Sequence, residues 1–205
     1  HTVEYFLIES CEMECIVDTI CEGPNQYEIF SNLTVFKASG CPRLISLFSP
    51  SLAQSLKKLK KLSLDRCDEM KQIISEEGNN PAGQPICLSK LETLEVEDCG
   101  KLEYIFPISI ARDLPQLESL SLQGLPQLKQ VFGQNREGEV GDCEIESHHQ
   151  PTGFPKLKTI KVVNCGNLEC LSIARDLPQL ESLELQDLPQ LKQVFGQNRE
   201  GEVGD

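Results

Sequence analysis

The sequence predicts an α/β solenoid, in which successive turns of chain stack into an arc with a parallel β-sheet along its concave face. One apolar pattern recurs about seven times in 205 residues. Every copy contains a short run in which apolar and polar side chains alternate, as they do in a half-buried strand. Aromatic residues make up only 5% of the chain, with no Trp, which suits thin layers of Leu and Ile better than one large core. Because no copy can bury its apolar stripe alone, residues 1–205 are expected to fold as a single domain.

The recurring pattern is L-x-x-L-x-L-x-x-C-x-x-L-x-x-I, and it is clearest from Leu91 to Ile105. Copies start near residues 3, 33, 59, 91, 117, 157 and 180, and the first of them is degenerate. The shorter distances between starts fall within the range of leucine-rich repeats, roughly 20–29 residues, and the longer ones contain insertions around 76–85 and 133–153. The pattern therefore predicts a leucine-rich-repeat horseshoe or arc, which we expect to be a piece of a longer protein.

The L-x-L segment of each copy predicts one strand. In Leu94-Glu95-Val96, for example, the two apolar side chains point inward and Glu95 points to solvent. Strands are predicted at 6–8, 36–38, 62–64, 94–96, 120–122, 160–162 and 183–185, each parallel to its neighbours. At roughly 4.8 Å per strand, such a sheet spans about 30 Å.

The returning segments on the convex face are expected to be irregular. Residues 49–56 predict a short helix, because Pro50 is tolerated in a first turn and Leu52 and Leu56 share one face. The Leu-Pro-Gln-Leu segments at 114–117, 125–128, 177–180 and 188–191 cannot be helix interior, so extended or 3₁₀ conformations are expected there.

A nearly exact duplication links two parts of the chain. Residues 109–142 recur as residues 172–205, and only Ser121/Glu184 and Gly124/Asp187 differ between the copies. A polar cap is absent from the sequence at either end of the array. Both end layers are therefore expected to expose apolar side chains.

The net charge of −13 argues against two classes of partner. Phosphate backbones repel such a chain, so nucleic acid is not an expected partner. An anionic membrane surface would not attract it either, and no apolar run approaches the roughly 20 residues of a spanning helix. No basic-then-apolar leader follows His1. A protein partner and a cytoplasmic, reducing location are therefore expected.

Five of the ten cysteines occupy the same repeat position: Cys11, Cys41, Cys67, Cys99 and Cys165. A buried Cys is a small apolar residue with a weak S–H donor, which fits a turn directly after a strand. Their spacing and the absence of a C-x-x-C pair match no usual zinc site. A structural role is expected, with no metal and no cofactor.

The sequence offers no catalytic arrangement. His148 and His149 lie near Cys143 in the longest insertion, where nothing fixes a ligand geometry. Gly133–Gly138 has the spacing of a phosphate-binding loop, but Glu139 stands where Lys is required. We therefore expect that the protein is not an enzyme.

The polar positions around the strands are the candidate partner-binding residues, because they would line the exposed concave sheet. Their charge changes from copy to copy, from basic in the second and third to acidic in the fourth, and again between the sixth and seventh. The candidates are Lys37, Lys60, Lys61, Asp65, Arg66, Glu95, Glu97, Asp98, Lys158, Lys161, Asn164 and Glu184. Either neighbouring bands neutralise each other on a solvated face, or the bands select a partner by charge register.

The chain resembles the C-terminal leucine-rich-repeat region of plant intracellular nucleotide-binding immune receptors of the coiled-coil class. The resemblance spans nearly the whole chain, and its most specific parts are Phe48–Ala53 and Leu62–Ile74 with Glu76 and Glu77 after them. It implies an arc that senses pathogen effectors, or host proteins that effectors modify, and that restrains the receptor's own nucleotide-binding domain. The nucleotide-binding domain itself is absent from this sequence.

Two other classes of binding protein remain as alternatives. F-box ubiquitin-ligase subunits also carry Cys-containing repeats of about 26 residues, but they usually continue after Cys with an Ile-Thr-Asp-x-Gly-Leu type of turn. This chain continues with Gly-Lys-Leu, Pro-Arg-Leu or Asp-Glu-Met. A secreted receptor ectodomain would show Asn at the Cys position and a regular period of 24 residues, and the chain shows neither.

Overall fold

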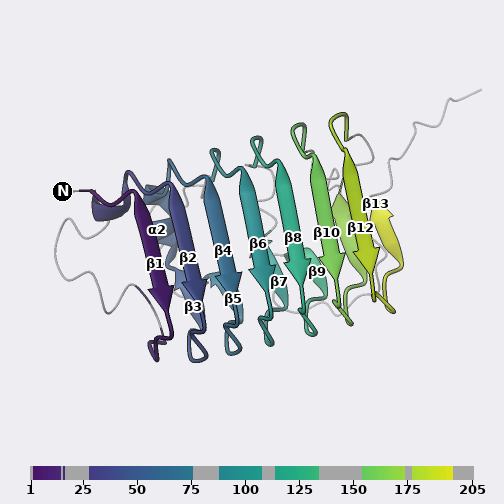
Figure 1. The fold of residues 1–205 in the computed structure, drawn as a ribbon, viewed down its shortest axis with the longest axis horizontal. Coiled ribbons are helices and arrows are strands. Elements are labelled where there is room, and N and C mark those ends of the chain that lie inside the picture. The colour runs from purple at the N-terminus through teal and green to yellow at the C-terminus, as the bar shows by residue number, and fades with distance from the viewer. Residues whose placement is uncertain are drawn as a thin grey trace, which may run out of the picture.

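The long parallel sheet runs through all seven copies of the repeat (Figure 1). The computed structural model describes residues 2–14, 16, 28–75, 88–107, 114–133, 154–173 and 177–195. The seven strands lie in sequence order and are all parallel, which confirms the predicted strands and their direction. They are β1 (Tyr5–Glu9), β2 (Val35–Ser39), β4 (Lys61–Asp65), β6 (Thr93–Glu97), β8 (Ser119–Gln123), β10 (Thr159–Val163) and β12 (Ser182–Gln186).

The second and fourth residues of each long-sheet strand point into the core. In β6 these are Leu94 and Val96, which are 1% and 0% exposed. The register places Leu94 directly between Leu62 of β4 and Leu120 of β8, so equivalent side chains stack from layer to layer. The core is thus a continuous column of apolar side chains, mostly aliphatic but with a cluster of phenylalanine rings in the first layers. Such a column is expected for a fold in which each layer is covered only by its neighbours.

The returning segments are more regular than the sequence predicted, because most of them form short strands behind the long sheet (Figure 1). One parallel sheet has the order β13-β11-β9-β7, and a second contains β3 and β5. The last apolar position of the repeat lies within each of these strands, for example Ile73 in β5 and Ile105 in β7. The strands are β3 (Ser46–Phe48), β5 (Gln72–Ile74), β7 (Tyr104–Pro107), β9 (Gln130–Gly133), β11 (Cys170–Ile173) and β13 (Gln193–Phe195).

The predicted short helix is confirmed as α2 (Pro50–Ser55), the one α-helix within the described ranges. Pro50 begins it, and the Ser49 side chain caps it by accepting a hydrogen bond from the Leu52 amide at 3.3 Å. A 3₁₀ helix, η1 (Glu28–Phe30), precedes the second copy. The Leu-Pro-Gln-Leu segments are tight turns: the Leu117 amide donates to the Leu114 carbonyl at 3.2 Å, and Leu128 to Leu125 at 3.2 Å. Of the extended and 3₁₀ conformations predicted for these segments, the bonds over three residues match the 3₁₀ one.

The residue after each long-sheet strand adopts a left-handed conformation. Seven residues share it, with φ between 49° and 61°: Ser10, Gly40, Arg66, Asp98, Gly124, Asn164 and Asp187. The amides of the first six donate to a carbonyl of the next layer, as Gly124 does to Val163 at 3.0 Å. The ladder of hydrogen bonds therefore extends one residue beyond the strand before the chain turns back.

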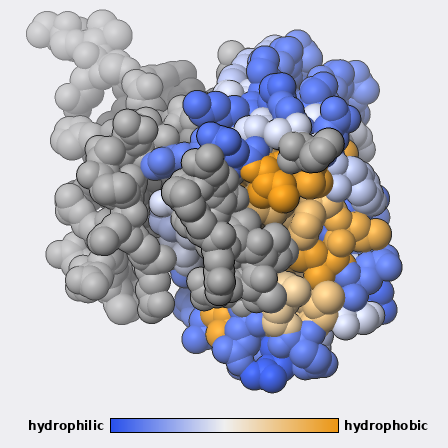
Figure 2. Space-filling view, turned by 90° about the vertical axis from the view of Figure 1, so that its left-hand side faces the viewer, coloured by the Kyte–Doolittle hydropathy of each residue, from blue (hydrophilic) through white to orange (hydrophobic). Residues whose placement is uncertain are grey.

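Apolar side chains are exposed at both ends of the described stack. In the last layer, Leu183 is 42% exposed and Leu185 is only partly buried, whereas Leu120 and Leu122 at the same positions of β8 are buried. At the β1 end, Val3 and Phe6 are also only partly buried, and Figure 2 shows apolar side chains gathered there between hydrophilic ones.

We expect the 205-residue chain to associate in solution through these end layers, because large apolar patches favour contact over exposure to water. Static light scattering over a concentration series should show a mass that rises with concentration. A constant monomer mass at high concentration would contradict this expectation.

Candidate functional site

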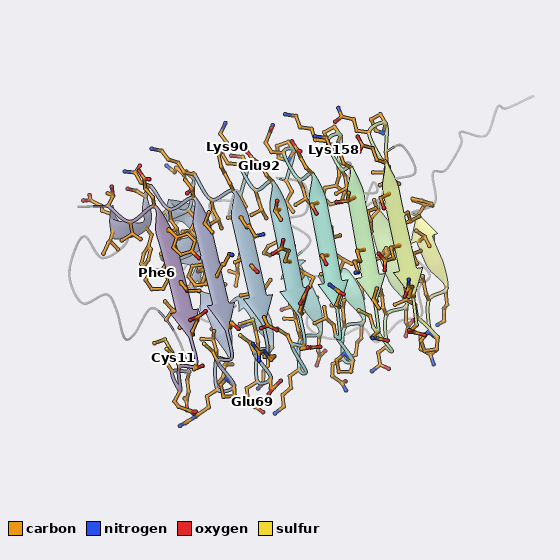
Figure 3. The ribbon with its side chains drawn as sticks, viewed as in Figure 1. Phe6, Cys11, Glu69, Lys90, Glu92 and Lys158 are labelled. Carbon is orange, nitrogen blue, oxygen red and sulfur yellow. The ribbon has the colours of Figure 1, made fainter. Side chains whose placement is uncertain are left out.

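The candidate site is the face of the long sheet that points away from the core, here called the outer face (Figure 3). The first, third and fifth residues of each strand lie on it, because the second and fourth point into the core and are buried in the five inner strands. The strand register aligns them into three rows across the sheet. The middle row reads Leu7, Lys37, Ser63, Glu95, Ser121, Lys161 and Glu184.

Seven of the twelve predicted binding residues lie on the outer face: Lys37, Lys61, Asp65, Glu95, Glu97, Lys161 and Glu184. The other five do not occupy strand positions, and for them the expectation is corrected. Lys60 and Lys158 lie one residue before their strands, at one edge of the sheet. Arg66, Asp98 and Asn164 lie in the left-handed turns at the opposite edge. The sheet ends there because the chain must turn back toward the core.

Opposite charges on the outer face pair across neighbouring strands. The Lys61 Nζ lies 2.7 Å from the Glu95 Oε1, and the Lys161 Nζ lies 3.7 Å from the Glu184 Oε1. The Glu97 carboxylate accepts a hydrogen bond from the Gln123 side chain at 2.7 Å. The basic and acidic bands are thus paired where they adjoin.

The Asp65 carboxylate is also partnered. It accepts hydrogen bonds from the Ser39 hydroxyl at 2.8 Å and from the Arg66 Nε at 2.9 Å. Arg66 therefore folds back over the end of its own strand, which fixes its guanidinium at the border of the outer face.

Charges also pair along the edge where the strands begin. The Lys60 Nζ lies 3.0 Å from the Glu92 Oε1, and the Lys158 Nζ lies 2.7 Å from the Glu118 Oε2 (Figure 3). The hydrogen bond between Lys158 and Glu118, with the attraction of their charges, lowers the pKa of Glu118 and raises the pKa of Lys158. Both side chains are well exposed, so the pair orders the edge without adding much stability.

The opposite edge carries a similar set of ion pairs between consecutive layers. They join Glu69 to Lys101 at 2.7 Å, Glu103 to Lys129 at 3.0 Å and Glu169 to Lys192 at 3.1 Å. Arg43 pairs with Glu14 in the first two layers. These residues lie in the turns rather than on the outer face.

The equivalent cysteines form a column at the turn. Each thiol donates to the carbonyl two residues earlier, as Cys99 does to Glu97 at 3.4 Å, and Cys41, Cys67, Cys99 and Cys165 are fully buried. Burial raises the pKa of the Cys41 and Cys165 thiols, and a hydrogen bond with Cys67 together with burial raises that of Cys99. The raised pKa of these three thiols favours the protonated form, which is the weaker nucleophile. The pKa of Cys67 is lowered instead, chiefly by its hydrogen bond with Cys99.

The described part of the chain holds no group of three or more His, Cys, Asp or Glu side chains that could bind a metal ion. His148, His149, Cys143 and the segment 134–138 lie outside the described residues, so the expectations for them remain predictions. Within the described ranges, no helix is long and apolar enough to cross a membrane.

An apolar group at one end of the outer face was not predicted from the sequence. Tyr5 and Leu7 of β1 are 52% and 44% exposed, and the register places them beside Val35 and Lys37 of β2. The signal was present in the sequence, since the positions that are polar in most other copies are aromatic or aliphatic in the first.

Stacked repeats with a polar outer face define this chain as a leucine-rich-repeat domain, a non-catalytic module of a type that generally binds proteins. The family model described as "Plant disease resistance protein RPS2-like, leucine-rich repeats" matches residues 11–68 and 69–124. The chain therefore belongs to the leucine-rich repeats of plant disease resistance proteins. Membership in this family favours the immune-receptor interpretation of the chain over the ubiquitin-ligase interpretation.

One curated relative is an Arabidopsis thaliana protein described as "Putative disease resistance protein At4g19050". It is 33% identical over 155 residues, which cover 74% of this chain and 11% of the relative. This chain thus spans about a tenth of the length of that relative. Among solved structures, the leucine-rich repeat domain of the type III effector XCV3220 (XopL) matches 92% of this chain and 70% of its own, at 18% identity and a TM-score of 0.39.

Proposed function

We propose that this chain is the ligand-sensing and autoinhibitory region of an intracellular plant immune receptor. Its partners are a pathogen effector, a host protein that an effector modifies, or the receptor's own nucleotide-binding domain. The observation that carries the proposal is the membership in the disease-resistance family together with an outer face whose residues are held in fixed rows by the sheet beneath them.

Rigid placement favours the outer face as the binding surface, because side chains on a sheet lose little further freedom when a partner binds. The paired charges add geometric selectivity, because a partner must match the order of the bands across the sheet. The column of buried thiols agrees with a reducing, intracellular location.

Reversal of Lys60 and Lys61 to Glu tests this function. Their side chains are 54% and 33% exposed, and each is paired with one carboxylate of the fourth repeat. Loss of two such surface pairs should cost no more than about 2 kcal/mol of unfolding free energy. In a full-length receptor, Lys60→Glu/Lys61→Glu should weaken partner binding or release the autoinhibited state, measured as effector-independent cell death.

Two controls separate the outer face from general effects of charge. Lys101→Glu breaks an ion pair of 2.7 Å in the turns, away from the outer face, and should leave signalling unchanged. His148→Glu/His149→Glu, in the insertion, should also be silent. If the insertion variant alters signalling and the Lys60/Lys61 variant does not, the binding surface is not the outer face.

A further inference from the structure

Three of the four apolar side chains on the outer face lie at its β1 end, and the fourth, Val163, ends β10. In the row of first strand residues, Tyr5 and Val35 are followed by Lys61, Thr93, Ser119, Thr159 and Ser182. In the middle row, Leu7 is the one apolar residue. Tyr5 and Leu7 are about half exposed, although burial of such a side chain is worth about 1.5–3 kcal/mol. The group formed by Tyr5, Leu7 and Val35 is here called the apolar corner.

Lys37, which lies beside the apolar corner, differs from the other lysines on the outer face in its ion pairing. Three lysines occupy outer-face positions in the described strands, and two of them, Lys61 and Lys161, pair with Glu95 and Glu184. Lys37 lies directly across from Leu7, and no described carboxylate lies within ion-pair distance of it. The corner therefore combines exposed apolar area with one cation that has no ion-pair partner among the described residues.

Two acidic residues near the apolar corner limit the kind of partner segment that can bind there. Glu4 precedes Tyr5 at the start of β1, and Glu9 ends the strand. A run of acidic residues would be repelled from both ends of β1, whereas a single carboxylate at Lys37 would be attracted. An aromatic or large aliphatic side chain that covers Tyr5 and Leu7 would bury the area that usually carries the binding energy of an interface.

We propose that the apolar corner and Lys37 bind a segment of a partner protein that presents one large apolar side chain next to one carboxylate. This assignment rests on the proposed function and specifies where the partner is anchored on the outer face. Tyr5 suits the receiving surface, because its exposed ring supplies contact area for the partner's apolar side chain. Its hydroxyl can still form a hydrogen bond with water or with the partner.

Selection of a phage-displayed random peptide library on the full 205-residue chain tests the proposal. The enriched peptides should carry Leu, Phe, Trp or Ile beside a single Asp or Glu. Affinities of the synthetic peptides would then be measured by fluorescence polarisation against the wild type and the Leu7→Ser and Lys37→Glu variants. Each substitution should weaken binding by about tenfold or more, which corresponds to about 1.4 kcal/mol.

Lys161→Glu is the matched control, since Lys161 occupies the same row on β10 but already has a carboxylate partner. It should change the peptide affinity by less than about twofold, and circular dichroism should show that all three variants remain folded. The proposal is overturned if no peptide is enriched, if the enriched peptides are basic or lack an apolar residue, or if their affinity is insensitive to Leu7 and Lys37. Those results would leave the proposed function standing, because the Lys60/Lys61 experiment measures it at a different place in a full receptor.

Discussion

Leu94→Ala should lower the free energy of unfolding by about 2–5 kcal/mol. Leu94 is 1% exposed at the centre of the long sheet, with Leu62 on one side and Leu120 on the other. Removal of its side chain leaves a cavity between two layers that are held in place by strand hydrogen bonds, so the neighbours can close it only in part. Urea unfolding followed by circular dichroism measures the loss.

Glu95→Ala is the paired control, one residue away on the opposite face of the same strand. Glu95 is one-third exposed and loses only its ion pair with Lys61, so the cost should stay below about 1 kcal/mol. Similar losses for Leu94→Ala and Glu95→Ala would show that the assignment of core and outer faces is wrong.

Gly124→Ala is expected to be the most costly of the turn substitutions. Gly124 has a φ of 61°, where a side chain costs about 1–2 kcal/mol. A Cβ at this position would also lie 2.0 Å from the Asp98 Oδ1 of the preceding layer. Asp98 is exposed, so its carboxylate can rotate away from the Cβ, and the rotation should add about 0.5–1.5 kcal/mol. The total should therefore be about 1.5–3.5 kcal/mol in thermal or urea unfolding.

Gly40→Ala separates the cost of the left-handed conformation from the cost of the steric contact with Asp98. Gly40 has the same φ of 61°, but the nearest atom to its Cβ would be the Ser10 Oγ at 3.6 Å, an ordinary contact. It should therefore show the conformational cost alone. Asp98→Ala combined with Gly124→Ala should recover the difference between the two glycine variants. Equal costs for Gly40→Ala and Gly124→Ala would mean that Asp98 moves aside freely.

The duplicated segments give this turn a natural comparison. Gly124 of the first copy is replaced by Asp187 in the second, which keeps the left-handed φ at 53°. The equivalent residue in the preceding layer is Asp98 for Gly124 and Asn164 for Asp187. A second aspartate next to Asp98 would add repulsion between two carboxylates, which does not arise next to the neutral amide of Asn164.

The sequence alone was sufficient to predict the long sheet. The residues of a strand alternate between two faces, so Leu94 and Val96 could be assigned to the core and Glu95 to solvent without any structure. Recurrence of the pattern then determined that the strands are parallel and in sequence order, because each repeat can cover only its neighbours. The capped turn of α2 could also be predicted, since Ser49 and Pro50 act locally.

Only the tertiary structure decided which side chains meet across layers. The strands behind the long sheet, such as β7 and β9, contain too few residues to show a period, and they form because the stacked layers bring their backbones side by side. The pairing of Lys61 with Glu95 depends on the register between segments separated by insertions of irregular length. So does the lack of an ion-pair partner for Lys37 within the described part of the chain. Contacts of this kind form between residues of different repeats, so the sequence of one repeat is not sufficient to predict them.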